Sequence, residues 1–234
     1  MSEINRYDDQ NSSLFVKTFK EAWSACCTDY DERIIDSEGT LQAALYHHLR
    51  SRLNPEQFVV FSEFSGKLSI DDSNKSNKLR VVVDLVVCQK HSSYLELIGA
   101  IEVKYKPRGR PSEQSVQKDM HSLSMMTRRR SNDSAIDIAV ERHHDGQTVR
   151  ISSVRKLVYA GIYQTGEGED HPPRLAEDFW VDAIRPTHGR WANSASIPPN
   201  LIVAIGEAPK PGSNGTLITH IFGDPIVRLT EQTQ

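Results

Sequence analysis

The chain contains the stretch Val81-Val82-Val83-Asp84-Leu85-Val86-Val87 and, further on, the stretch Ile98-Gly99-Ala100-Ile101-Glu102-Val103-Lys104-Tyr105. Both have the apolar, β-branched composition of strands that are buried on two faces, yet ionisable side chains interrupt each of them. Burying such a group is costly unless it is paired or binds a metal. Interruptions in two consecutive strands therefore predict a functional site.

The geometry of a strand indicates how these groups meet. Side chains alternate between the two faces, so Glu102 and Lys104 point to the same face, about 7 Å apart. If the two stretches pair antiparallel, Asp84 lies opposite or diagonal to Glu102. Two carboxylates and the backbone carbonyl of Ile101 or Val103 suit Mg²⁺ or Mn²⁺. With the Lys104 ammonium beside them, they predict metal-assisted hydrolysis of a phosphodiester.

A simpler interpretation needs no ligand. Glu102 and Lys104 would form an ion pair on a solvated edge strand, and Asp84 would lie at a bulge.

The flanking sequence predicts an α/β chain with a mixed central sheet flanked by helices, in the order ααβββαβ(α)ββ. We expect helices at 14–27, at 37–53 and after Ser112, and strands from Phe58, at 80–87, 95–105, 156–164, 201–207 and 216–222. The segment between the third helix and 156 is expected to be irregular, and 175–184 is compatible with a short helix. We expect a single domain over 1–234, with a core at about 37–164 and a C-terminal extension with a hairpin at about 165–234.

Val83-Asp84, then seventeen residues, then Glu102-Val103-Lys104 resembles the motif of the PD-(D/E)xK phosphodiesterase superfamily, with Val83 in place of the proline. The resemblance covers roughly residues 37–164 and implies a restriction-endonuclease-like core, α-β-β-β-α-β. It also implies that Asp84 and Glu102 bind Mg²⁺ or Mn²⁺, and that Lys104 orients the attacking water and stabilises the transition state.

Members of that superfamily often add an acid from the helix before the strands. Glu38 fits this role, because it lies three residues before Leu41 and seven before Leu45 and so shares their apolar stripe. Gln42, one turn later, could hydrogen-bond a metal-bound water or a phosphate. An acid in the first turn of a helix also interacts favourably with the helix dipole, which is an alternative account of Glu38.

Charge is distributed unevenly along the chain. The 234 residues include 28 Lys+Arg and 31 Asp+Glu, a net charge of -3, which excludes a polybasic protein that binds through bulk charge. Residues 100–160 nevertheless hold twelve basic and seven acidic residues, a net charge of +5. A phosphate backbone at the site would need such a flank. The candidate substrate-binding residues in this region are Lys106, Arg108 and Arg110, and Arg128–Arg130 either bind phosphate or complement a helix end. Lys118, a further substrate-binding candidate, and Asp119 lie on the helix after the motif, where the resemblance to the superfamily implies accessory polar residues.

These observations predict a nuclease, dependent on Mg²⁺ or Mn²⁺, that acts on DNA in defence, restriction or a mobile element. The alternative is a catalytically silent module of the same fold that binds a protein partner or senses nucleic acid, and a small-molecule phosphohydrolase is a weaker third candidate. A homodimer or a partner subunit would serve to cut both strands. The polar N-terminus, three cysteines without CxxC spacing and no apolar run of ~20 residues predict a cytoplasmic protein without a membrane partner.

Overall fold

The structure, a computed structural model, describes residues 3–72, 75–108, 112–125, 136–140, 148–151, 156–163, 201–209 and 215–222. Its helices are α1 (Glu3–Asp31), α2 (Glu38–Arg52) and α3 (Glu113–Met125). Its strands are β1 (Phe58–Asp72), β2 (Lys75–Lys90), β3 (Leu95–Lys106), β4 (Ile136–Val140), β5 (Thr148–Ile151), β6 (Lys156–Tyr163), β7 (Leu201–Glu207) and β8 (Ile218–Phe222).

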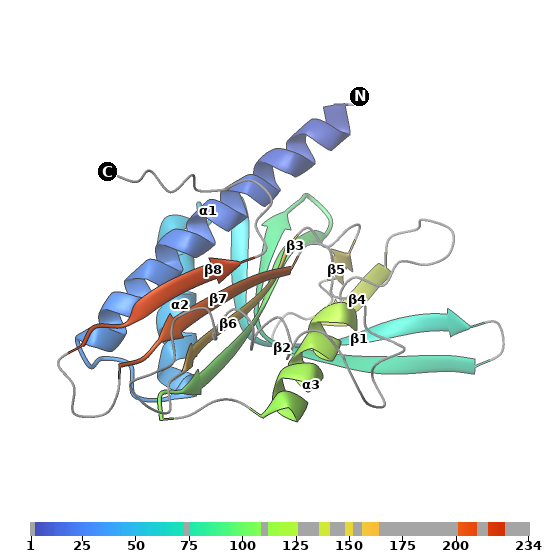
Figure 1. The fold of residues 1–234 in the computed structure, drawn as a ribbon. Helices are drawn as coiled ribbons and strands as arrows, with labels where there is room; N and C mark the ends of the chain where they lie inside the picture. Colours follow the sequence, from blue (N-terminus) through green and yellow to red (C-terminus); the bar gives the residue numbers. More distant parts are fainter. Residues whose placement is uncertain are drawn as a thin grey trace.

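The strands form a mixed sheet, so the predicted α/β class with a mixed central sheet is confirmed (Figure 1). β1, β2 and β3 pair antiparallel in chain order, as short connections require. β6 lies beside β3 and parallel to it, β7 continues parallel to β6, and β8 pairs antiparallel with β7. The expected C-terminal hairpin is therefore present.

The segment expected to be irregular before β6 contains two short strands, so this prediction was wrong. β4 and β5 pair antiparallel with each other. β4 also pairs with the far part of β1, and β5 with the beginning of β3, which closes β1, β4, β5, β3 and β2 into a ring. Strands of four or five residues carry too little alternation to stand out in a sequence. The expected helix at 175–184, Arg110 and Arg128–Arg130 lie outside the described residues.

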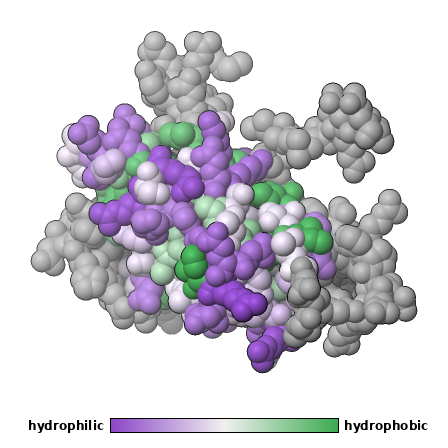
Figure 2. Space-filling model, turned by 90° about the vertical axis from the view of Figure 1, so that its left-hand side faces the viewer, coloured by the Kyte–Doolittle hydropathy of each residue, from purple (hydrophilic) through white to green (hydrophobic). Residues whose placement is uncertain are grey.

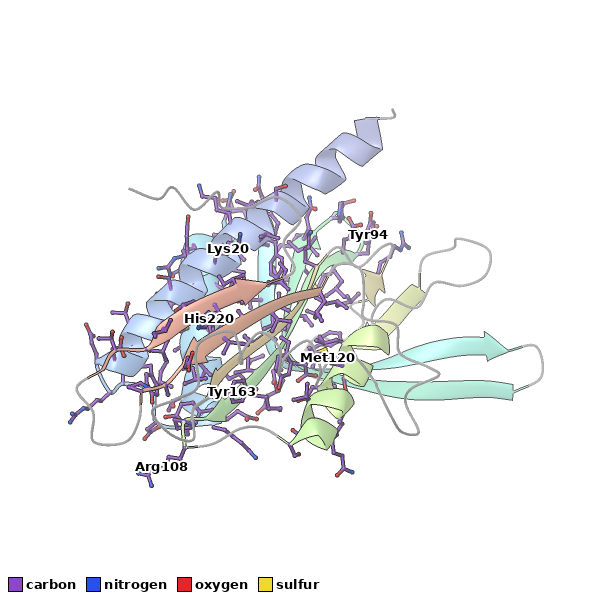
Figure 3. All side chains as sticks on the ribbon, viewed as in Figure 1. Lys20, Tyr94, Arg108, Met120, Tyr163 and His220 are labelled. Carbon is purple, nitrogen blue, oxygen red and sulfur yellow. The ribbon has the colours of Figure 1, made fainter. Side chains whose placement is uncertain are left out.

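The sheet separates two apolar clusters. On one face α1 and α2 contribute side chains such as Trp23 and Leu45, which pack on Leu85, Val103 and Ile162. On the other face α3 packs on the sheet through a cluster that includes Met120 and Tyr163, both labelled in Figure 3. The candidate site therefore lies in a sheet that has helices on both faces.

The surface is mostly polar where the structure describes it. On the face in Figure 2, hydrophilic side chains surround small separate apolar areas. No described helix combines the length and the hydropathy that crossing a membrane requires.

The long hairpin of β1 and β2 turns away from the rest of the sheet (Figure 1). Val60 packs on the cluster of α1 and α2, whereas Phe64, four residues later on the same strand, packs on the cluster of α3. Strict alternation would place both on one face. The exception is explained by Glu63, whose φ of 50° is in the left-handed region that non-glycine residues rarely adopt. The backbone is thus strained where the hairpin turns.

Candidate active site

β2 and β3 separate at Asp84. Their ladder ends at the pair Leu85 and Ile101, so the backbone N–H of Val103 has no acceptor on β2. The Asp84 side chain takes over this role, and its Oδ2 accepts the hydrogen bond from Val103 N at 2.7 Å. The carbonyl of Asp84 accepts a second bond, from Gln42 Nε2 on α2, at 2.9 Å. Asp84 is therefore held by both its side chain and its backbone at the opening between the strands.

The kink in β1 accounts for the opening. The pairs Ser62–Leu85 and Phe64–Val83 place the strained Glu63 directly across from Asp84. As the hairpin turns at this point, β2 follows β1 and leaves β3. The acid in the apolar run of β2 thus lies at the position where the sheet splits.

The beginning of α2 brings Glu38 to the same opening. Ser37 caps the helix in a capping box with Thr40, which fixes where the first turn starts. Glu38 Oε2 accepts a hydrogen bond from Tyr105 N at 3.3 Å, and its Oε1 lies 3.5 Å from Lys104 Nζ. Asp84 and Glu38 thus bind alternate N–H groups along the edge of β3.

Lys104 connects the two faces of the sheet. Its Nζ lies 3.5 Å from Glu38 of α2 and 3.5 Å from Asp119 Oδ2 of α3. The Lys104 side chain is 18% exposed. Asp119 Oδ2 is buried and accepts no hydrogen bond from the described residues. Its polar neighbour is the Lys104 ammonium at 3.5 Å. Asp119, expected as an accessory group, is thus brought into contact with Lys104.

The crowding of carboxyl groups changes their acidity. Burial, reinforced by the negative charges of Asp84 and Asp119, raises the pKa of Glu102 to about 10. Burial also raises the pKa of Asp119 to about 6, although Lys104 opposes this shift. Burial alone would lower the pKa of Lys104, but the surrounding carboxylates outweigh it and raise that pKa. At neutral pH the site therefore holds a protonated lysine and a protonated Glu102.

The donor set has the chemistry that a hard divalent cation requires. Asp84, Glu102, Glu38 and Asp119 supply carboxylate oxygens, and the buried Oδ2 of Asp119 has no hydrogen-bond donor among the described residues. No three Asp, Glu, His or Cys side chains of the described residues are already grouped as a metal site. The residues thus fit Mg²⁺ or Mn²⁺ in type and charge, but they are not arranged around an ion.

The interpretation as a solvated edge strand is wrong. β2 has already separated from β3 at Glu102, but β3 stays paired with β6 from Gly99 to Lys106, and Glu102 is only 6% exposed, so the group is buried and not solvated. Asp84 does lie at an irregularity, because the ladder between β2 and β3 ends there.

The structure places the remaining candidates as follows. Gln42 enters the site through the backbone of Asp84. Lys106 and Arg108 are exposed at the end of β3, where Figure 3 shows Arg108 at the margin of the molecule. Lys118 is exposed on α3, next to the buried Asp119. Val103 contributes its backbone N–H to the bond with Asp84.

Sequence reasoning missed two features beside the site. One is the strain at Glu63, for which a single exposed acid in a strand gives no signal. The other is a buried pair on β6, in which the hydroxyls of Tyr159 and Tyr163 share a hydrogen bond of 2.8 Å. Their spacing of four places both on one face of a strand, which was the available signal. Burial raises the pKa of both phenols, so they remain neutral.

The site thus combines groups from α2, β2, β3 and α3, and its assignment depends on these contacts. When the chain is compared with protein-family models, with curated proteins and with solved structures, none of the three comparisons finds a match.

Proposed function

We propose that the chain is a nuclease that depends on Mg²⁺ or Mn²⁺ and hydrolyses phosphodiester bonds, with DNA as its substrate. The observation that carries the proposal is the opening between β2 and β3, where Asp84, Glu102, Lys104 and Glu38 converge. Buried titratable groups with strongly shifted pKa values are typical of active sites. An opening in a sheet also gives a substrate access to side chains that a continuous ladder would enclose.

The arrangement of the elements supports the resemblance to restriction-endonuclease-like proteins. α2 covers one face of the antiparallel strands β1, β2 and β3, and α3 covers the other. β6 then lies parallel to β3. This is the order α-β-β-β-α-β that the resemblance implies, with β4 and β5 as an insertion between α3 and β6.

In this proposal Asp84 and Glu102 hold the cation, and Glu38 and Asp119 add negative charge around it. The bound metal would polarise a phosphate oxygen and make a water more acidic. Glu102 would have to lose its proton to bind the cation, so metal binding would weaken as the pH falls below the raised pKa of Glu102. The backbone bonds of Asp84 keep its carboxylate in place without the ion.

Lys104 acts as a hydrogen-bond donor in this mechanism, not as a base. Its raised pKa keeps the ammonium charged at neutral pH. Glu38 and Asp119 hold that ammonium from opposite sides of the sheet. From there it orients the attacking water and offsets the charge that develops on the phosphate. The basic excess of residues 100–160 attracts the backbone of the substrate.

The test is a cleavage assay with the full chain. Supercoiled plasmid, single-stranded DNA and RNA are incubated with Mn²⁺, with Mg²⁺ or with EDTA, using wild type, Asp84→Asn and Lys104→Ala. We expect cleavage of DNA that requires the metal and disappears in both variants, while Glu32→Gln, which changes an exposed acid in the turn after α1, cleaves like wild type. Equal cleavage by wild type and either site variant would refute the mechanism, and preferential cleavage of RNA would correct the substrate.

A second candidate is the catalytically silent module. Two observations favour it: no described set of side chains is already grouped as a metal site, and Glu102 is protonated at neutral pH. Thermal unfolding with increasing Mn²⁺ separates the two candidates. A rise in Tm that Asp84→Asn abolishes supports the enzyme, whereas a wild-type Tm that does not respond to metal supports the module.

A further inference from the structure

A pocket of about 460 Å³ lies between the C-terminal half of α2 and the first half of β1. Its size is within the range of small-molecule sites. The aromatic side chains in its lining include Tyr46 and Phe61, and its cations are Arg50 and Lys90. Glu63 is the acid among the lining residues, so the pocket has a net charge of +1.

The pocket and the candidate active site lie along one row of side chains on α2. Glu38, Gln42, Tyr46 and Arg50 follow one another at intervals of four residues, and such side chains lie on the same face of a helix. Glu38 contacts β3, Gln42 contacts β2, and Tyr46 and Arg50 line the pocket over β1. The row therefore crosses three strands, over about 18 Å from Glu38 to Arg50.

The floor of the pocket is also connected to the site. Glu63, the strained residue of β1 that lies across from Asp84, is one of the residues that line the pocket. A ligand in the pocket would therefore contact the same kink that opens the sheet at Asp84.

The side chains suit a nucleotide. The Arg50 guanidinium donates a hydrogen bond to Tyr46 Oη at 2.9 Å and lies 5.9 Å from the centre of its ring, which holds the ring at the pocket wall. Lys90 Nζ donates one hydrogen bond, to the Pro55 carbonyl at 2.7 Å, and an ammonium has three hydrogens to donate. An aromatic ring beside cations is how proteins bind a base and its phosphate in single-stranded nucleic acid.

We infer that this pocket binds a nucleotide of the substrate strand, separated from the bond that is cleaved by the ~18 Å that the row on α2 spans. A base stacks on Tyr46, and its phosphate is bound by Arg50 and Lys90. The inference rests on the proposed nuclease function for the identity of the ligand, but the pocket itself binds without metal or cleavage. The chain would thus bind an unpaired strand at two points, which are the opening at Asp84 and the pocket.

The test measures binding in EDTA, so that chemistry does not contribute. Fluorescence anisotropy is recorded for labelled single-stranded DNA of two, four, six and eight nucleotides with the full chain. We expect Kd to fall steeply once the strand is long enough to span both points. Tyr46→Ala and Arg50→Gln should remove this gain and raise Kd for the longer strands about tenfold, while Tyr46→Phe keeps the stacking and most of the affinity.

The matched control is Arg52→Gln, which removes the same charge from the exposed last turn of α2, outside the pocket. It should leave Kd within about twofold of wild type. This small change is the general electrostatic effect of losing one positive charge near a phosphate backbone. Thermal unfolding checks that each variant is folded.

The outcomes separate this inference from the proposed function. If the chain does not cleave DNA but its binding still depends on strand length and on Tyr46 and Arg50, the pocket inference stands and the proposed nuclease function is refuted. If the chain cleaves DNA with metal but Kd does not change with strand length, the pocket inference is refuted. It is also refuted if Arg50→Gln and Arg52→Gln change Kd equally. Binding of apolar peptides there in preference to DNA would overturn it as well.

Discussion

Asp84 Oδ2 accepts a hydrogen bond from the backbone N–H of Val103 at 2.7 Å, beyond the last pair at which β2 and β3 are still joined. The carboxylate therefore substitutes for the missing backbone acceptor of a neighbouring strand. The same side chain is the leading metal ligand of the proposed site. Structure and chemistry are thus coupled in one residue, and substitutions at Asp84 can separate the two.

Asp84→Asn and Asp84→Ala should differ in stability but not in activity. Asparagine keeps an oxygen that accepts the hydrogen bond of Val103, so we expect a small change in the free energy of unfolding. Alanine leaves a buried N–H without an acceptor and should cost about 1–3 kcal/mol. Both variants should lose cleavage. Urea denaturation and the cleavage assay measure the two effects, and equal stability of both variants would show that the hydrogen bond contributes nothing.

Glu102→Gln should stabilise the protein at neutral and alkaline pH. Because the pKa of Glu102 is raised to about 10, the folded state binds more protons than the unfolded state between the ordinary value of 4.5 and 10. Stability is then lost as pH rises through this window. Glutamine removes that penalty, and we expect a gain of at least about 1 kcal/mol, or roughly 2–4 °C in Tm.

The comparison is made by thermal unfolding of wild type and Glu102→Gln in EDTA from pH 4 to pH 9. The Tm values of the two proteins should be similar near pH 4, and the Tm of Glu102→Gln should exceed that of wild type by an increasing amount as the pH rises. Parallel curves would mean that Glu102 titrates normally in the folded protein.

Lys104→Ala should abolish cleavage and also destabilise the chain. The ammonium balances Glu38 and Asp119, which would otherwise repel each other beside the buried Glu102. Loss of the donor should lower kcat by at least about 100-fold. Lys17→Ala, which removes an exposed lysine from α1, provides the control. A Lys104→Ala variant that is inactive and as stable as wild type would argue against the ion pairs.

Gln42→Leu should weaken catalysis without removing it. Gln42 Nε2 is the donor to the Asp84 carbonyl, so leucine leaves that carbonyl unpaired and frees the backbone beside the metal ligand. We expect a loss of about 1 kcal/mol in stability and a severalfold fall in kcat with KM nearly unchanged. Gln57→Leu, at an exposed position before β1, is the matched control. A rise in KM alone would instead indicate that Gln42 contacts the substrate.

Local pattern was sufficient to predict the helices and the two strands that carry the site. The leucine repeat of α2 and the apolar runs of β2 and β3 define faces and strands without reference to the rest of the chain. Charges placed inside these runs identified Asp84, Glu102 and Lys104, because a buried charge is too costly to be accidental. β4 and β5 were not found, since their few residues pair with distant strands and carry little pattern of their own.

The sequence by itself determined which side chains are polar inside apolar strands, and so which residues form the candidate site. The tertiary structure alone decided how they meet: that the sheet opens at Asp84, that Glu38 and Asp119 reach Lys104 from opposite faces, and that Glu63 is strained across from Asp84. The physical reason is that alternation and periodicity act between residues close in sequence. The opening depends instead on where two strands stop pairing, which is set by contacts between segments far apart in the chain.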